Sequence, residues 1–394
     1  MVLIAFPPNI VAAAPIILTN SQSAATPAPF QQMVSVDMSK YSSYAAPNLQ
    51  NIEFFYTDGT LIPSWLESGS SSTTAIWWLS IANGIGANSS LTVYMGFALQ
   101  SVNLFDGITV GEAPQLSGTY GQYDNGAKVF SFYDNFKGTT LSSVWSVPSG
   151  SNYQVNNGFI GEPSGGSTTA VYNANVQETG SIIAEWELNL SSTVYPDATD
   201  YSYFQLNRYS VSSNMHFLGI QGIDDIANNG SPIASESIAG SGIHSFGIRN
   251  DGATVEWFYD GNVLYSETSA VVDTDYLSLG WAYNGQPNNF PTIYWVRVRA
   301  YPPSGTMPGV TADPPLDACA GPTYPLIVAQ IVKPSLAPKG VSPKANTGSL
   351  FILQNACPAP AETLAQAQQQ LANQKYLTPP STTTQNFTIT LLGA

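Results

Sequence analysis

The most constraining feature of this sequence is its series of short segments in which apolar and polar residues alternate. Gly, Asn, Asp, Ser and Pro separate these segments from one another. Alternation with a period of two places every second side chain on the same face of a β-strand. No pattern of a long amphipathic helix occurs before the last quarter of the chain. The sequence therefore predicts an all-β protein built from β-sandwich or jelly-roll domains.

The first predicted domain is a β-sandwich over residues 14–118, preceded by an apolar extension over residues 1–13. Within it, Asp58-Gly59 lies between two apolar runs, as the turn of a β-hairpin does. The segment LTVYMGFA follows as a further strand, because its larger apolar residues share one face. These residues are Leu91, Val93, Met95 and Phe97.

The second predicted domain is a jelly roll over residues 119–301. Asp260-Gly261 marks a second hairpin, between TVEWFY and NVLYS. The segment YWVRVRAY closes the domain as a strand, with its valines expected inside and with Arg297 and Arg299 expected to face water.

The composition changes after the second domain. Residues 302–316 are rich in proline and predict an extended connector. Residues 317–394 predict a small C-terminal domain of strands and one short helix, since Leu364, Ala367 and Leu371 have helical spacing.

Few residues of this chain are charged: 9%, against roughly a quarter in typical soluble proteins. The aromatic content of 12% argues against disorder. A net charge of -15 with 11 Lys and Arg residues makes a basic groove hard to build, so nucleic acid is disfavoured as a partner. A surface of hydroxyls and amides changes its charge little with pH, which suits an acidic exterior.

Several stretches are similar to known extracellular domains. In the first domain they are NSQSAATPAPFQQMV, NLQNIEFFYTDGTLIPSWLES and NLFDGITVGEAPQLSGTYGQYDNGAKVF, and in the second they are FYDNFKGTTLSSVW, TVEWFYDGNVLYS and TIYWVRVRAYPPSGTMPGVT. The first set resembles a domain family of unassigned function in archaeal cell-surface proteins. The second set resembles the concanavalin-like, laminin-G-type jelly roll that often follows it. The resemblance covers residues 14–311 and implies an extracellular cell-surface protein with a capacity for sugar binding, but no reaction.

An extracellular location affects how the cysteines and the Asn-X-Ser/Thr sequons are interpreted. Cys319 and Cys357 could be free thiols, but this location favours a disulfide between them, worth roughly 4 kcal/mol in the chain-entropy model. It also makes four sequons candidates for N-glycosylation. They are Asn88, Asn189, Asn229 and Asn386.

Glu185 and Glu187 are the best candidates for a catalytic pair, because they share one strand face as the carboxylates of a retaining glycosidase do. Asn189 occupies the next alternate position, where the glycosidase pattern requires an acid, so both glutamates are expected to face solvent. His216 and His244 lack further metal ligands in the sequence. Neither a nucleophile elbow nor a phosphate-binding loop occurs. We therefore expect no enzymatic activity, no metal and no cofactor.

Aromatic residues gather in two places. Trp77 and Trp78 are adjacent in a predicted strand, and core or inter-sheet packing is expected for them. Trp281 and Tyr283 belong to GWAYNGQPNNF, which could form a loop that stacks on sugar rings. Packing and carbohydrate binding are about equally favoured for these two residues.

Both ends of the chain are apolar and uncharged. Pro7 and Pro8 interrupt the first apolar run, which makes it a poor signal peptide and too short for a transmembrane helix. The last segment alternates as a β-strand does, and it could close its own domain, remain an exposed edge, or pair with another copy. Donation to another copy from either end gives a contact that repeats into a filament. The donor residues would be Val2, Ile4 and Phe6, or Phe387, Ile389 and Leu391.

The sequence thus predicts an extracellular structural subunit of an archaeal surface filament or surface layer, which associates with further copies by β-strand donation from a chain terminus. The alternative is a surface adhesin that binds carbohydrate. A glycoside hydrolase is a third and less favoured hypothesis.

Overall fold

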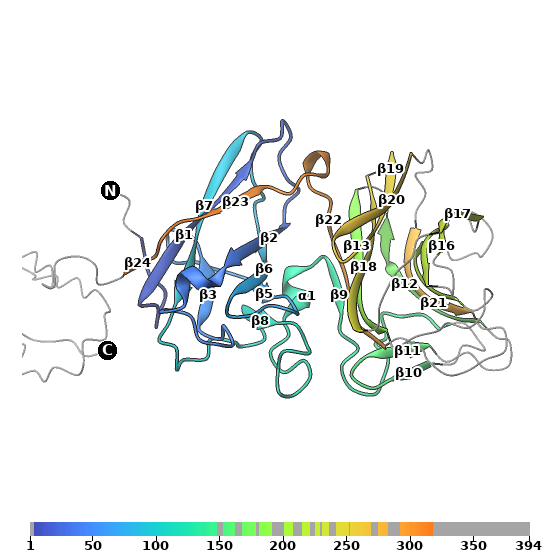
Figure 1. The fold of residues 1–394 in the computed structure, drawn as a ribbon, viewed down its shortest axis with the longest axis horizontal. Coiled ribbons are helices and arrows are strands. Elements are labelled where there is room, and N and C mark those ends of the chain that lie inside the picture. The colour runs from blue at the N-terminus through green and yellow to red at the C-terminus, as the bar shows by residue number, and fades with distance from the viewer. Residues whose placement is uncertain are drawn as a thin grey trace, which may run out of the picture. The chain divides into compact units, whose positions relative to one another are not determined.

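The computed structural model shows a protein built almost entirely from β-strands, as the sequence predicts (Figure 1). All described residues belong to a compact unit, Met1–Thr323. No helix in the described part of the chain is long and apolar enough to cross a membrane. The predicted helix and terminal strand of the last segment lie outside the described residues. The structure describes residues 4–147, 153–161, 168–178, 181–190, 201–207, 215–220, 225–228, 231–235, 242–251, 253–268, 275–282 and 292–317.

The first sandwich consists of two sheets. One has the order β23-β1-β7-β3-β4, with β24 also beside β1; these strands span Gly309–Ala312, Ala12–Asn20, Ser89–Phe97, Ile52–Phe55, Leu61–Ile62 and Leu316–Asp317. The other has the order β2-β6-β5-β8, over Phe30–Asp37, Thr74–Ile81, Ser64–Leu66 and Val110–Glu112. The predicted shared face of Val93, Met95 and Phe97 is confirmed, because all three lie in the core between the sheets.

The Asp58-Gly59 hairpin is also confirmed. Strand β3 pairs antiparallel with β4, and Phe54 lies opposite Ile62. Gly59 has a φ of +85°, a conformation that costs glycine little, and the Asp58 carboxylate accepts a hydrogen bond from the Thr60 N–H at 3.0 Å. The turn residues therefore fix the register of this hairpin.

The second sandwich is a jelly roll of two antiparallel sheets. One has the order β10-β11-β22-β13-β18-β19-β20, with β9 also beside β22; these strands span Tyr153–Val155, Phe159–Gly161, Thr292–Ala300, Ile182–Leu190, Gly242–Asn250, Thr254–Tyr259, Asn262–Thr268 and Phe132–Asp134. The other has the order β12-β21-β14-β15-β16-β17, over Thr168–Glu178, Asp275–Ala282, Tyr201–Asn207, Met215–Ile220, Asp225–Asn228 and Ser231–Ser235. Trp186, Trp257 and Leu277 are among the buried residues of the core between them.

The predicted hairpin at Asp260-Gly261 joins β19 and β20. Both turn residues have a positive φ, 46° and 77°, as a type I′ turn requires. The twist of that turn matches the twist of the flanking strands, which is why an Asp-Gly pair marks this connection.

The segment 302–316 is more than the extended connector that its prolines predict, because part of it forms strands. After the 3₁₀ turn η2 (Pro303–Gly305), the chain returns to the first sandwich, where β23 and β24 pair antiparallel with β1. Leu18 lies opposite Val310, and Ala13 lies opposite Leu316. The edge of β1 otherwise exposes unpaired backbone groups, and pairing satisfies them. The second sandwich is consequently inserted between β8 and β23 of the first (Figure 1).

Candidate functional site

Four charged side chains lie on the outer face of the second sandwich. Glu185 and Glu187 belong to β13, and Arg297 and Arg299 belong to its neighbour β22, where Glu185 lies opposite Arg297. All four were expected to face water, and that expectation is wrong. Their exposed fractions are 6%, 5%, 3% and 8% in the order given. They are buried because the first sandwich covers this face of the sheet.

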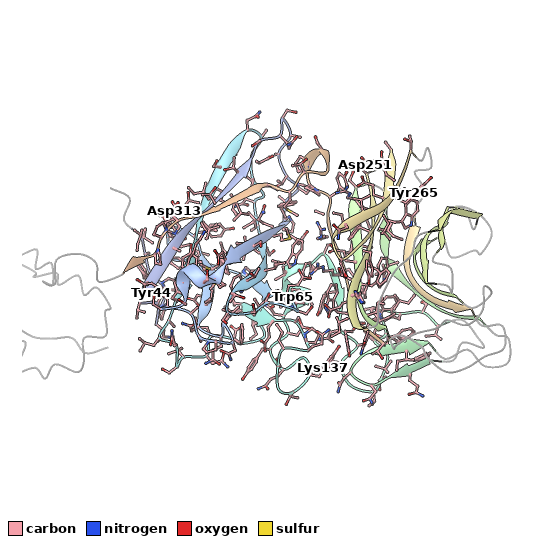
Figure 2. All side chains as sticks on the ribbon, in the orientation of Figure 1. Tyr44, Trp65, Lys137, Asp251, Tyr265 and Asp313 are labelled. Carbon is pink, nitrogen blue, oxygen red and sulfur yellow. The ribbon has the colours of Figure 1, made fainter. Side chains whose placement is uncertain are left out.

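Aromatic residues from both sandwiches make the cover. Trp65 of β5 and Trp78 of β6 come from the first sandwich, and Trp295 of β22 comes from the second. Phe130 follows the short helix α1 (Gly126–Val129), which leads from the first sandwich to the second. The rings of Trp65 and Trp295 meet edge to face with centroids 5.7 Å apart. Figure 2 shows Trp65 on the side of the first sandwich that faces the second.

Glu185 binds both arginines. Its Oε2 accepts hydrogen bonds from Nε of Arg297 at 2.6 Å and from Nε of Arg299 at 2.8 Å. Its Oε1 accepts a third from Nη2 of Arg299 at 3.0 Å. Burial alone would raise the pKa of Glu185, but the two guanidiniums outweigh burial and hold that pKa at about 2. Glu185 is therefore an ionised, fully paired carboxylate.

Arg297 also reaches across to the first sandwich. Its Nη1 lies 3.0 Å from Oε1 of Glu67, whose Oε2 accepts a hydrogen bond from Nε1 of Trp78 at 2.5 Å. Its guanidinium carbon lies 4.6 Å from the ring centroid of Trp78 and 4.5 Å from that of Trp295. A guanidinium at these distances is stabilised by the ring quadrupoles. Arg297 thus joins the two sandwiches by charge and by stacking.

Glu187 lacks a guanidinium of its own. Its carboxylate accepts hydrogen bonds from Oγ of Ser68 and Nε2 of Gln115, both of the first sandwich. Burial, together with nearby Glu67, raises the pKa of Glu187 to about 7, against the opposing effects of its donors and of Arg297. We call the group Glu67, Glu185, Glu187, Arg297 and Arg299 the inter-sandwich cluster.

Asp124, beside this cluster, accepts hydrogen bonds from four residues that lie in different parts of the chain. It accepts hydrogen bonds from Nε1 of Trp65 at 2.8 Å, the N–H of Gly126 at 2.9 Å, the hydroxyl of Tyr133 at 2.7 Å and Nδ2 of Asn135 at 2.7 Å. Burial raises the pKa of Asp124, and these four donors oppose the increase. Asp124 was not identified as a structural residue from the sequence. The available signal was its position two residues before Gly126, where α1 begins and where a carboxylate can accept a hydrogen bond from the first N–H of the helix.

The structure describes only part of the predicted carbohydrate-binding pair, and it places one of the two histidines against Tyr259 and Asp260. Trp281 lies in β21, with its backbone opposite Thr169 and Ser202, and Tyr283 lies outside the described residues. His244 stacks on Tyr259 at 4.9 Å, and its Nδ1 lies 2.8 Å from Asp260. Among the described residues, no group of three or more His, Cys, Asp and Glu side chains could hold a metal ion. Carbohydrate binding therefore stays a prediction.

The structure describes only some of the predicted sequons, cysteines and donor residues. Asn88 lies exposed in the turn before β7, whereas Asn189 lies in β13 between two neighbouring strands, and its Nδ2 donates to the hydroxyl of Tyr294 at 3.4 Å. Outside the described residues lie Val2, Asn229, Asn386, Cys319, Cys357, Phe387, Ile389 and Leu391.

The N-terminal segment packs against the first sandwich of the same chain. Ile4 and Phe6 pack against a small apolar cluster on the outer face of the first sandwich, and the ring of Phe6 lies 6.1 Å from that of Phe55. The N–H of Ala5 donates to the carbonyl of Thr57 at 3.0 Å. Ile4 and Phe6 thus have intramolecular partners in this structure, and their donation to another copy stays a prediction.

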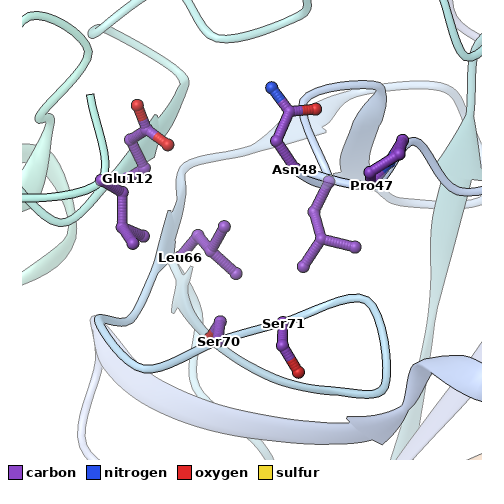
Figure 3. Close-up of a pocket in the computed structure, with 8 residues that line it drawn as sticks. Pro47, Asn48, Leu66, Ser70, Ser71 and Glu112 are labelled. Atoms are coloured by element: carbon purple, nitrogen blue, oxygen red, sulfur yellow. The ribbon is translucent and has the colours of Figure 1, made fainter. Parts of the chain in front are cut away.

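A shallow cavity opens on the first sandwich (Figure 3). Leu49 and Leu66 form part of its apolar lining, and the Glu112 carboxyl lies at its side. Oε1 of Glu112 accepts a hydrogen bond from Oγ of Ser117 at 2.6 Å, and burial raises the pKa of Glu112. The cavity has an empty volume of about 450 Å³, which includes open solvent.

Comparisons with known proteins give one sequence relative and several partial structural matches. No family model matches the chain. An uncharacterized protein, 562, of Sulfolobus islandicus rod-shaped virus 1 is 28% identical over 336 residues, which are 75% of this chain. The chain spans 58% of the length of that relative.

Several solved structures match part of the chain at low TM-scores. A β-glucanase of Bacillus licheniformis has a TM-score of 0.35 at 12% identity and covers 43% of this chain and 97% of its own. An endo-β-1,3-glucanase of Pyrococcus furiosus has a TM-score of 0.36 at 12% identity, over 44% and 94%. The carbohydrate-binding module CBM66 of Bacillus subtilis has a TM-score of 0.32 at 11% identity, over 40% and 96%. These similarities are too distant to indicate a function for this chain.

Proposed function

We propose that this chain is a structural protein of an extracellular surface, in which the first sandwich holds the second as a fixed head. The contact between the sandwiches carries this proposal. It encloses the rings of Trp65, Trp78 and Trp295, each at most 2% exposed. Separating the sandwiches would expose these rings at a cost of about 2–3 kcal/mol each. It would also break the ion pair of Glu67 with Arg297.

The same contact supports a role without catalysis. The ionised Glu185 is paired with two guanidiniums, and Glu187 is covered by Ser68 and Gln115 of the first sandwich. A glycosidase needs both carboxyls of its pair open to a sugar. This pair serves packing instead of hydrolysis.

We further infer that the chain assembles with other copies through residues 386–394. The alternation of that segment and its lack of charge support strand donation. The N-terminal residues Ile4 and Phe6 are engaged within the molecule, which leaves the C-terminal segment as the proposed donor. A relative from a rod-shaped virus fits a chain that works in an extracellular particle, filament or layer.

Electron microscopy of the purified full chain tests this function. We expect filaments or lattices from the full chain, single particles after removal of residues 386–394, and retained assembly after removal of residues 1–6. Single particles from the full chain would contradict the assembly role. Glycan-array binding by those particles, lost in Trp281→Ala, would then favour the adhesin hypothesis.

A further inference from the structure

Glu187 lies where groups from several structural elements converge on the contact between the sandwiches. Ser68 and Gln115 donate to its carboxylate from the first sandwich. Its cross-strand neighbours are Ser245 of β18 and Trp295 of β22. The titratable and charged groups around it are Glu67 of the first sandwich, Glu185 of β13, Arg297 and Arg299 of β22, and the hydroxyls of Tyr120 and Tyr133.

The charges of the inter-sandwich cluster balance without Glu187. Glu67 and Glu185 supply two negative charges, and Arg297 and Arg299 supply two positive charges. An ionised Glu187 adds one uncompensated negative charge to a contact from which water is largely excluded. Burying an uncompensated charge is costly, whereas a protonated carboxyl is neutral.

Gln115 can pair with either protonation state of Glu187. Gln115 donates its amide nitrogen to Oε1 of Glu187, while its amide oxygen is buried without a hydrogen-bond partner. The two ends of an amide can exchange places by rotation about the side chain. A protonated Glu187 can then donate its O–H to the Gln115 oxygen, which satisfies an acceptor that the ionised form cannot satisfy.

We propose that the contact between the two sandwiches is a proton-operated latch, closed while Glu187 carries a proton and loosened when the proton leaves. The inference rests on the proposed role of this contact in holding the second sandwich as a head. It adds a condition to that role, because the second sandwich is held most tightly in acid and less tightly towards neutral and alkaline pH.

The direction follows from the two glutamates of β13. The pKa of Glu187 is raised to about 7 in the closed state, from 4.5 when exposed, so closing takes up a proton between those values. The contribution of Glu187 to the stability of the closed state is full below about pH 4.5 and is lost as the pH rises through about 7. Glu185 does not oppose this direction, because the two guanidiniums that lower its pKa to about 2 belong to β22 of the same sandwich and stay beside it when the contact opens. The closed state is therefore favoured most below about pH 4.5.

Single-molecule energy transfer on the full chain tests the latch. Dyes are attached through unnatural azido residues at Ile108 of the first sandwich and Val263 of the second, which are 64% and 53% exposed. One fixed distance is expected at pH 4.5, and an open population is expected to grow by pH 8, as the closing equilibrium falls on the order of 100-fold. In Glu187→Gln, which is neutral at every pH, the fixed distance should persist at pH 8.

The matched control is Glu112→Gln. Glu112 is another buried glutamate with a raised pKa, but its partner Ser117 belongs to the same sandwich, so the wild-type profile should remain. Gln115→Leu removes the amide donor that holds the pKa of Glu187 down, so the midpoint should move to higher pH. This variant decides the question should Glu187→Gln fail to fold. A flat wild-type profile, or unchanged midpoints in both Glu187→Gln and Gln115→Leu, would overturn the latch. Assembly is measured separately by electron microscopy. A chain that polymerises but shows no pH-dependent opening contradicts the latch alone, and a chain that opens with pH but does not polymerise contradicts the assembly role alone.

Discussion

Substituting methionine for Arg297 should lower the free energy of unfolding by about 3 kcal/mol. Arg297 is 3% exposed and lies 2.6 Å from Glu185 and 3.0 Å from Glu67, so its loss leaves Glu67 without its cation and Glu185 with one guanidinium instead of two. Breaking a buried ion pair costs about 3–5 kcal/mol. The lower end applies because Glu185 keeps two hydrogen bonds from Arg299. Methionine retains most of the volume between the tryptophan rings, so the measured loss reports charge more than a cavity.

The assay is urea unfolding of the full chain at pH 5, followed by tryptophan fluorescence. Arg249→Met is the matched control, because Arg249 pairs with Glu256 on the same sheet at side-chain exposures of 23% and 21% and should cost about 1 kcal/mol or less. Adding Glu67→Gln to Arg297→Met should recover part of the loss, since one unpaired charge then disappears. Equal effects of Arg297→Met and Arg249→Met would refute the account of the inter-sandwich cluster.

Three further predictions concern single positions. Glu53 is 5% exposed, its Oε1 has no hydrogen-bond partner, and burial together with Asp106 raises its pKa to about 7. The ionised carboxylate is therefore unfavourable at pH 8. Glu53→Gln should stabilise the chain by about 1–2 kcal/mol at pH 8 and change its stability little at pH 4, in the same urea assay. Phe6→Ala should lower the melting temperature, through loss of about 1 kcal/mol, without preventing assembly seen by microscopy. In a host that N-glycosylates, mass spectrometry should find glycan at Asn88 and none at Asn189; occupancy at Asn189 would contradict its placement in a central strand.

The sequence predicts local structure well where one side-chain period or one turn decides it. Asp58-Gly59 and Asp260-Gly261 form the expected hairpins, because the positive φ that such turns need is a property of the turn residues themselves. The inward face of β13 follows equally from alternation, as the burial of Trp186 confirms. These outcomes depend on residues that are neighbours in the chain.

The candidate site depends on contacts between residues far apart in the sequence, and alternation cannot reveal them. A period of two separates Glu185 from Trp186 but does not say whether the second face meets water or another sandwich. The available signal was chemical. In a chain with 9% charged residues, two glutamates and two arginines at alternate positions of two strands are too many charges to be incidental. The register that sets Glu185 opposite Arg297 could not be read from either strand alone.

The return of the chain to β1 has a mechanical consequence. Because β23 and β24 belong to the first sandwich, tension applied through the residues after Asp317 reaches that sandwich first, at the pairs that join β24 to β1. The second sandwich lies on a closed excursion of the backbone between β8 and β23, so it is a side branch and not a link in series. A pull along the chain from end to end would load the first sandwich and leave the second unstretched.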